Sequence, residues 1–81
     1  MRVRILYFQN VKLRAGTPEE FMEVPEGATV AELTEKIVAA HPEIGPIARS
    51  LLFAVNEEQV GQSHLLTDGD TLALMPPFSG G

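Results

Sequence analysis

Short hydrophobic segments, separated by polar turns, dominate the pattern along this 81-residue chain. The first of them begins with alternating charged and apolar residues and is rich in residues that favour extended backbone. Polar residues, glycine or proline close each segment. The pattern predicts β-strands at residues 2–8, 21–24, 51–55 and 71–75, with a very short return strand at residues 59–60.

The last predicted strand, residues 71–75, differs from the others because it is almost continuously apolar. Such a run is typical of a strand that is covered on both faces, so we expect it to lie in the centre of a sheet. The segment Thr67-Asp68-Gly69-Asp70 comes just before it and has the composition of a tight turn.

The strongest helix signal begins at Thr29. This residue is a good N-cap, and Glu32 follows three positions later, which is the spacing of a capping box. An apolar stripe at helical spacing then runs through Val30, Leu33 and Ile37 and on to Val38 or Ala40. The helix should stop at His41, because a residue that precedes proline avoids the helical region.

Two weaker signals predict a short helical turn at residues 10–15 and a short helix or turn at residues 43–50. The element order is therefore β-β-α-β-(β)-β, with the first two strands forming a hairpin-like pair. This order indicates an α+β fold in which one main helix packs on a mixed sheet, as in the β-grasp arrangement of ubiquitin-like proteins. We expect one domain over residues 1–75 and an extended tail over residues 76–81.

The pattern changes abruptly after residue 75. Pro76 and Pro77 cannot donate sheet hydrogen bonds and favour an extended chain, so the sheet should end there. Phe78, Ser79, Gly80 and Gly81 follow, and from Pro76 such a tail could reach about 20 Å if extended. The glycines lack side chains and would fit a narrow channel in another protein. The alternative is a frayed end without function.

Composition excludes several classes of function. Without cysteine the chain cannot use a disulfide framework, a thiolate zinc site or cysteine catalysis. The net charge of −5 argues against nucleic-acid binding and is better matched to a basic protein surface. No apolar run is long enough to cross a membrane, and no signal-peptide pattern opens the chain, so we expect a cytoplasmic protein.

The candidate chemistry is that of the carboxylate on Gly81. A terminal carboxylate is anionic near neutral pH and must be converted into an acyl species with a good leaving group, such as an acyl-adenylate made from ATP, before it reacts. The sequence has no glycine-rich phosphate-binding loop. We therefore expect a separate enzyme to consume ATP and activate Gly81, and no tightly bound cofactor in this chain.

Four segments of the chain, taken together, form a recognisable set: Val3-Arg4-Ile5-Leu6-Tyr7-Phe8, Ala54-Val55-Asn56, Leu66-Thr67-Asp68-Gly69-Asp70 and Pro76-Pro77-Phe78-Ser79-Gly80-Gly81. This set resembles the small subunit of molybdopterin synthase, a ubiquitin-like sulfur carrier of the MoaD type. The resemblance covers nearly the whole chain, and one departure is Phe78, where that family often has a smaller aliphatic residue.

The resemblance implies that an E1-like adenylating enzyme activates Gly81, which then receives sulfur as a thiocarboxylate. It also implies that the large subunit of molybdopterin synthase receives the tail, residues 76–81, in a 2+2 heterotetramer. There the sulfur passes to cyclic pyranopterin monophosphate during molybdenum cofactor biosynthesis. The catalytic residues would lie on the large subunit, so that this chain would not be an enzyme alone.

Other interpretations remain open at this stage. A sulfur carrier for thiamine or tRNA thiolation and a ubiquitin-like protein modifier would use the same Gly81, and a purely structural interaction domain would not need it. The two histidines, His41 and His64, have no metal-ligand spacing, and His41 is expected at a helix end. The pairs Glu19-Glu20 and Glu57-Glu58 are interpreted as solvated turn residues.

A docking surface could use some of the large apolar residues, although most must form the core. The candidates are Phe8, Phe53, Leu74, Met75 and, above all, Phe78 on the tail.

Overall fold

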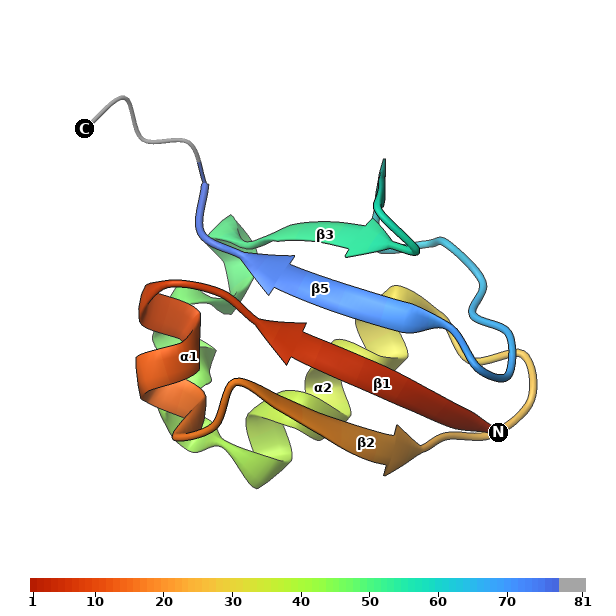
Figure 1. The fold of residues 1–81 in the computed structure, drawn as a ribbon, viewed down its shortest axis with the longest axis horizontal. Helices are drawn as coiled ribbons and strands as arrows, with labels where there is room; N and C mark the ends of the chain where they lie inside the picture. Colours follow the sequence, from red (N-terminus) through yellow and green to blue (C-terminus); the bar gives the residue numbers. More distant parts are fainter. Residues whose placement is uncertain (78–81) are drawn as a thin grey trace.

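The strands join into one mixed sheet with the spatial order β2-β1-β5-β3-β4 (Figure 1). The computed structural model describes residues 1–77, so that Phe78, Ser79, Gly80 and Gly81 lie outside the described part of the chain. The strands are β1 (Arg2–Tyr7), β2 (Glu19–Glu23), β3 (Leu52–Val55), β4 (Glu58–Val60) and β5 (Thr71–Met75). The helices are α1 (Asn10–Ala15), α2 (Val30–Ala40) and the 3-10 helix η1 (Pro42–Ser50).

The central pair is β1 and β5, which run parallel with Ile5 opposite Leu72. The other pairs, β1 with β2, β3 with β5 and β3 with β4, are antiparallel. The expected α+β fold with a mixed sheet, the pairing of the first two strands and the central position of the last one are confirmed. The described chain does not cover β5 on both faces, however, because Leu72 and Leu74 are fully buried whereas Ala73 and Met75 are only half-buried.

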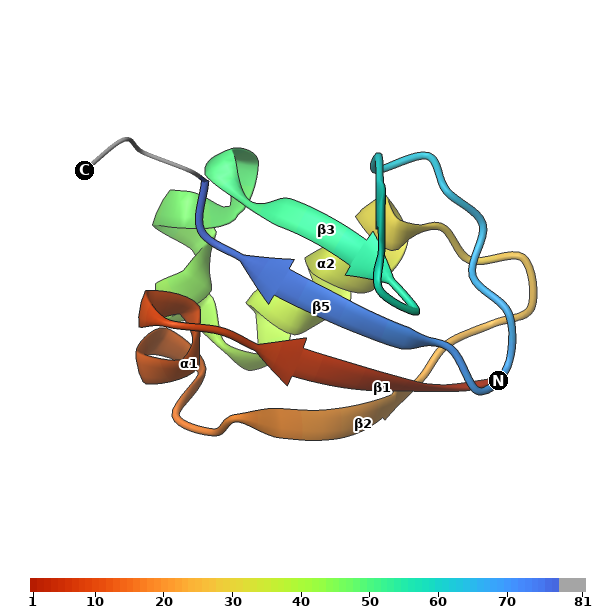
Figure 2. The same cartoon turned by 45° about the horizontal axis from the view of Figure 1, so that its top comes forward.

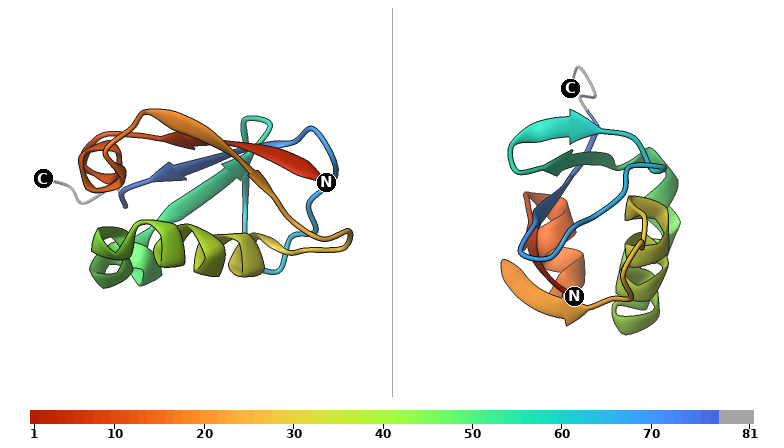
Figure 3. Two further views of the ribbon diagram at one scale, coloured as in Figure 1. Left: turned by 90° about the horizontal axis from the view of Figure 1, so that it is seen from below. Right: turned by 90° about the vertical axis from the view of Figure 1, so that its right-hand side faces the viewer.

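Helix α2 crosses one face of the sheet (Figures 1 and 3). Its start is the predicted capping box: the Thr29 side chain accepts from the Glu32 backbone, and the Glu32 carboxylate accepts from the Thr29 backbone at 2.8 Å. Val30, Leu33 and Ile37 are fully buried against the sheet, as the stripe predicted. The helix ends where His41 precedes proline.

Helices α1 and η1 close the end of the molecule near the last residues of α2 (Figures 1 and 2). Gly16 ends α1 in the left-handed conformation, with φ of 78°, which a residue with a Cβ adopts only at a cost. The Arg14 guanidinium donates to the Glu43 carbonyl at 2.9 Å and joins the two helices. The second helical segment, expected as a short helix or turn, is a 3-10 helix that buries Ile44.

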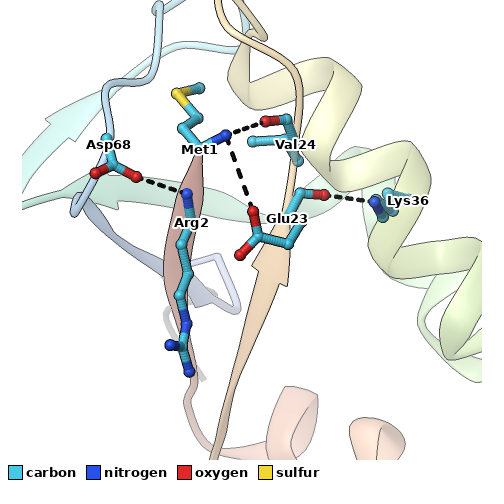
Figure 4. Close-up of polar contacts among 6 residues, drawn as sticks. All are labelled: Met1, Arg2, Glu23, Val24, Lys36 and Asp68. Carbon is cyan, nitrogen blue, oxygen red and sulfur yellow. Dashed lines mark hydrogen bonds and ion pairs between the residues drawn. The ribbon is translucent and has the colours of Figure 1, made fainter.

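The opposite end of the sheet is fixed by backbone bonds around the start of β1 (Figure 4). The Met1 nitrogen donates to the Val24 carbonyl at 2.7 Å, and the Val24 N–H donates back at 2.8 Å, which extends the β1–β2 ladder. The Arg2 N–H donates to the Asp68 carboxylate at 2.7 Å. The Gly69 N–H donates to the Arg2 carbonyl at 2.9 Å, so that Arg2 holds the turn before β5 against the start of β1.

Asp70 joins the turn that precedes β5 to the turn between β3 and β4, and both turns lie beside the start of β5. Its side chain is buried, and the carboxylate accepts from the Thr67 N–H (2.8 Å), the Thr67 hydroxyl (3.0 Å) and the Asn56 amide (2.9 Å). The Asn56 amide oxygen in turn accepts from the Thr71 N–H at 3.0 Å. Burial alone would raise the pKa of the Asp70 carboxyl, but the bonds from Thr67 and Asn56, with the charge of His64, outweigh burial and lower the pKa.

We expect Asp70→Asn to lower the free energy of unfolding by about 1–3 kcal/mol near neutral pH, because an amide cannot accept from all three donors. The carboxylate's contribution is complete above the unfolded-state pKa of about 3.9 and is lost as pH falls through the lower folded-state pKa. The difference between wild type and variant should therefore shrink in acid. Urea denaturation at several pH values measures it, with Glu35→Gln on the exposed side of α2 as control. An equal difference at every pH would contradict the assignment.

Candidate functional site

The sequence places the functional group on the segment that follows β5. The strand ends at Met75, and Pro76 and Pro77 leave the sheet on the side of the molecule where α1 lies (Figure 1). The prediction that these prolines end the sheet is confirmed, since neither can donate a ladder bond. The other predicted site residues, Phe78, Ser79, Gly80 and Gly81, lie outside the described residues, so their roles stay predictions.

A groove runs over the sheet face opposite α2, beside the point where Pro76 and Pro77 leave. The alternation along the strands creates this face: residues that neighbour the buried ones point to the other side of the sheet. The floor of the groove consists of half-buried apolar side chains from three strands, namely Leu6, Leu52, Ala73 and Met75. The groove is therefore an open sheet surface that continues to Pro76 and Pro77, rather than a closed pocket.

The two ends of the groove differ in character. Phe8 and Gln9, which follow β1, lie with the two prolines at the tail end. Arg4, Thr71 and the Asn56-Glu57 turn lie at the other end, where the first residues of β5 pair with β1 and approach β3. The groove thus combines an apolar end beside the tail with a polar end about one strand length away.

The expected apolar docking residues divide into two groups. Phe53 and Leu74 are buried in the core. Phe8 is 42% exposed and Met75 is half-buried, and both line the groove. Phe78 lies outside the described residues. Sequence reasoning missed Leu6, Leu52 and Ala73, which face outward into the groove. Side chains alternate between the two faces along a strand, so each of these residues could have been placed on the outer face from its position next to a buried one.

Arg4, which lines the groove, is paired with a charged side chain from β2. The Arg4 guanidinium donates to the Glu19 carboxylate, with 2.9 Å between Nε and Oε2, and the bond and charge of each group favour the ionised form of the other. This contact raises the pKa of Arg4 and lowers the pKa of Glu19. Nearby, the Arg2 guanidinium lies 4.3 Å from the centre of the Phe21 ring. Both arginines are thus held over the sheet by neighbours from β2.

A second polar group lies on the helix side of the sheet. The Tyr7 hydroxyl donates to a Glu20 oxygen at 2.6 Å, and His41 Nε2 contacts the same oxygen. The Tyr7 and His41 rings meet edge to face with 5.8 Å between centroids. Our interpretation of Glu19 and Glu20 as solvated turn residues was wrong, because both lie in β2 and have side-chain partners. His41 is at the helix end, as expected.

The Tyr7 cluster joins β1, β2 and the end of α2, and it is separated from the groove by the sheet. The position indicates a structural role, because strand and helix are both held by Glu20. Within residues 1–77, no group of three or more His, Asp or Glu side chains could hold a metal ion. Burial of Tyr7, followed by its bond to Glu20 and the charge of that carboxylate, raises the pKa of the phenol above its ordinary value.

We expect Tyr7 to resist alkaline ionisation until the chain unfolds. The phenol is favoured in the neutral form by the fold, so its contribution is lost as pH rises above the unfolded-state pKa of about 10. Tyr7 is the only tyrosine and tryptophan is absent, so ultraviolet absorbance of phenolate reports on this residue alone. The absorbance change should coincide with loss of circular dichroism. Phenolate formation near pH 10 in a chain that is still folded would refute the expectation.

The arrangement defines a class of protein. Within residues 1–77, a mixed five-stranded sheet packs against one main helix, and in the sequence two prolines come directly after its central strand β5; the arrangement is the β-grasp fold of ubiquitin-like proteins, as expected. Among the described helices, none is long and apolar enough to span a membrane.

Comparison with known proteins identifies the family. The model of the ThiS family matches residues 5–81, and the chain therefore belongs to the ThiS family. The molybdopterin synthase sulfur carrier subunit of Chlamydomonas reinhardtii is 37% identical over the full length of both chains. The resemblance to molybdopterin synthase small subunits is thus confirmed.

Solved structures agree with this assignment. The putative molybdopterin converting factor subunit 1 of Pyrococcus furiosus is similar with a TM-score of 0.87 and 32% identity, covering 95% of this chain and 98% of that one. The SAMP1 protein of Haloferax volcanii is similar with a TM-score of 0.86 and 26% identity over the whole of both chains. The fold is thus shared by the molybdopterin converting factor subunit of Pyrococcus furiosus and by SAMP1 of Haloferax volcanii.

Proposed function

We propose that this chain is the sulfur carrier subunit of molybdopterin synthase and that Gly81 carries the sulfur. The observation that supports it most strongly is the full-length similarity to a subunit of that name in Chlamydomonas reinhardtii. Within the proposal, residues 1–75 are the β-grasp domain and residues 76–81 are the tail, and the protein works in the cytoplasm.

The proposed chemistry uses the carboxylate of Gly81. An E1-like adenylating enzyme would join it to AMP from ATP with release of pyrophosphate, and a sulfur donor would then displace AMP to leave a thiocarboxylate. The thiocarboxylate would give its sulfur to cyclic pyranopterin monophosphate and return as a carboxylate. The chain acts as a reagent in this scheme, and the catalytic residues of sulfur transfer belong to its partner.

The proposed partner is the large subunit of molybdopterin synthase, in a 2+2 heterotetramer. A partner that takes the tail must also meet the surface from which Pro76 and Pro77 leave, and this surface is the groove with its apolar floor. The net charge of −5 suits a partner with a basic surface. Tail and groove together would form the binding surface, with the tail residues Phe78, Ser79 and Gly80 inside the partner.

A second candidate function is that of a ubiquitin-like protein modifier, in which Gly81 forms an isopeptide bond with lysine. The similarity to SAMP1 of Haloferax volcanii favours this alternative, because SAMP1 stands for small archaeal modifier protein 1. A sulfur carrier for thiamine or tRNA thiolation is a further alternative. The similarity to the molybdopterin subunits is higher in identity, and so the first proposal is preferred.

Reconstitution tests the proposal. The chain is incubated with the adenylating enzyme, ATP and a sulfur donor, then with the large subunit and cyclic pyranopterin monophosphate. We expect the intact mass to show exchange of oxygen for sulfur, followed by formation of molybdopterin. A variant that lacks Gly81 should form no thiocarboxylate yet unfold at the same temperature, since residue 81 lies beyond the last strand. Thiocarboxylate on the shortened chain, or conjugates to lysine with no molybdopterin, would refute the proposal.

Phe78 is the predicted anchor of the tail. We expect Phe78→Ala to weaken binding to the large subunit about tenfold or more, because aromatic anchors at interfaces are typically worth above 1 kcal/mol. The melting temperature should change little. Calorimetric titration measures the affinity, and Leu13→Ala on α1, where the side chain is 77% exposed, is the matched control. An unchanged dissociation constant would exclude Phe78 as an anchor.

A further inference from the structure

Three residues other than glycine adopt positive φ within residues 1–77: Gln9 at 53°, Asn56 at 51° and Glu57 at 74°. A side chain with a Cβ is generally disfavoured there; asparagine tolerates this conformation well, whereas glutamine and glutamate are less stable in such a position than glycine would be. All three line the groove, with Gln9 at the tail end and the other two at the polar end. The unfavourable backbone of the described chain is thus concentrated on the rim of one surface.

Gln9 occupies a turn position that ordinarily belongs to glycine. The Val11 N–H donates to the Phe8 carbonyl at 3.0 Å, which closes a β-turn with Gln9 as its first central residue. With φ of 53° and ψ of −129°, the turn is of type II′, in which this position favours glycine. The Gln9 side chain makes no capping bond to α1 and is exposed. Within residues 1–77, the Gln9 side-chain amide has no hydrogen-bond partner that would offset the unfavourable backbone conformation.

At the polar end of the groove, Glu57 also occupies a turn position that favours glycine. Val55 pairs with Glu58, so that Asn56 and Glu57 form a two-residue connection between β3 and β4 with both residues at positive φ. Such a turn favours asparagine followed by glycine. Asn56 is accounted for by its bonds to Asp70 and Thr71. Glu57 stands at the glycine position, and within residues 1–77 its exposed carboxylate takes part in no ion pair.

We propose that Gln9 and Glu57 are contact residues for the large subunit, retained for binding although glycine at either position would give a more stable fold. This inference rests on the proposed function. The Gln9 amide can donate to and accept from a polar group of the partner beside the tail, and the Glu57 carboxylate can accept from a lysine or arginine. Strained residues are characteristic of functional surfaces. The two residues then mark both ends of the partner's footprint, with the apolar floor between them.

The test compares glycine and alanine at both positions. Gln9→Gly and Glu57→Gly remove the side chain and relieve the backbone, so they should raise the melting temperature by a few degrees. Both should weaken binding to the large subunit by about 2–10-fold. Gln9→Ala and Glu57→Ala should weaken binding equally without the gain in melting temperature. Glu35→Ala, on the exposed side of α2, is the control and should change neither value.

Calorimetric titration against the purified large subunit and thermal unfolding give the two readouts. Loss of affinity at Glu57 should disappear at high salt, because a charge contact is screened, whereas the loss at Gln9 should remain. Unchanged affinity in both glycine variants, or no gain in melting temperature, would overturn this inference while leaving the proposed function intact. Failure of the wild-type chain to bind the large subunit would instead refute the proposed function together with the inference.

Discussion

The parallel pairing of β1 with β5 is the interaction on which the rest of the structure depends. It joins the two ends of the sequence in the centre of the sheet, with Ile5 opposite Leu72 and Tyr7 opposite Leu74. Because parallel strands point the same way, the end of β5 lies beside the end of β1. The Phe8 N–H accordingly donates to the Leu74 carbonyl at 3.1 Å. This pairing puts Pro76, the first residue after β5, beside the turn that follows β1.

Each strand of the central pair serves two different surfaces. The buried residues, such as Ile5 and Leu72, belong to the hydrophobic core between the sheet and α2. Their neighbours Leu6 and Ala73 form the floor of the groove on the other face. The side chains of the core and those of the groove are thus separated by the alternation of the strands, and changes to the groove need not disturb the core.

Side-chain hydrogen bonds join the elements of the sheet at both of its ends. Asp70 joins the start of β5 to the turn between β3 and β4, and the contacts among Tyr7, Glu20 and His41 join β1 and β2 to the end of α2. Favourable bonds gather in these places, whereas the unfavourable backbone of Gln9 and Glu57 lies on the groove. A stable fold can carry such local strain where binding depends on the strained residues.

The sequence by itself determined the elements and the candidate chemistry. Local signals are sufficient for them: alternation for the strands, Thr29 with Glu32 for the start of α2, and Pro76-Pro77 for the end of the sheet. Only the tertiary structure decided the parallel neighbour of β5, the partner of Glu20 and the open outer face of the sheet. The reason is that these depend on residues far apart in the chain, whose meeting no local pattern records. Positive φ at Gln9 likewise follows from the path of the chain around β1, against the preference of the residue itself.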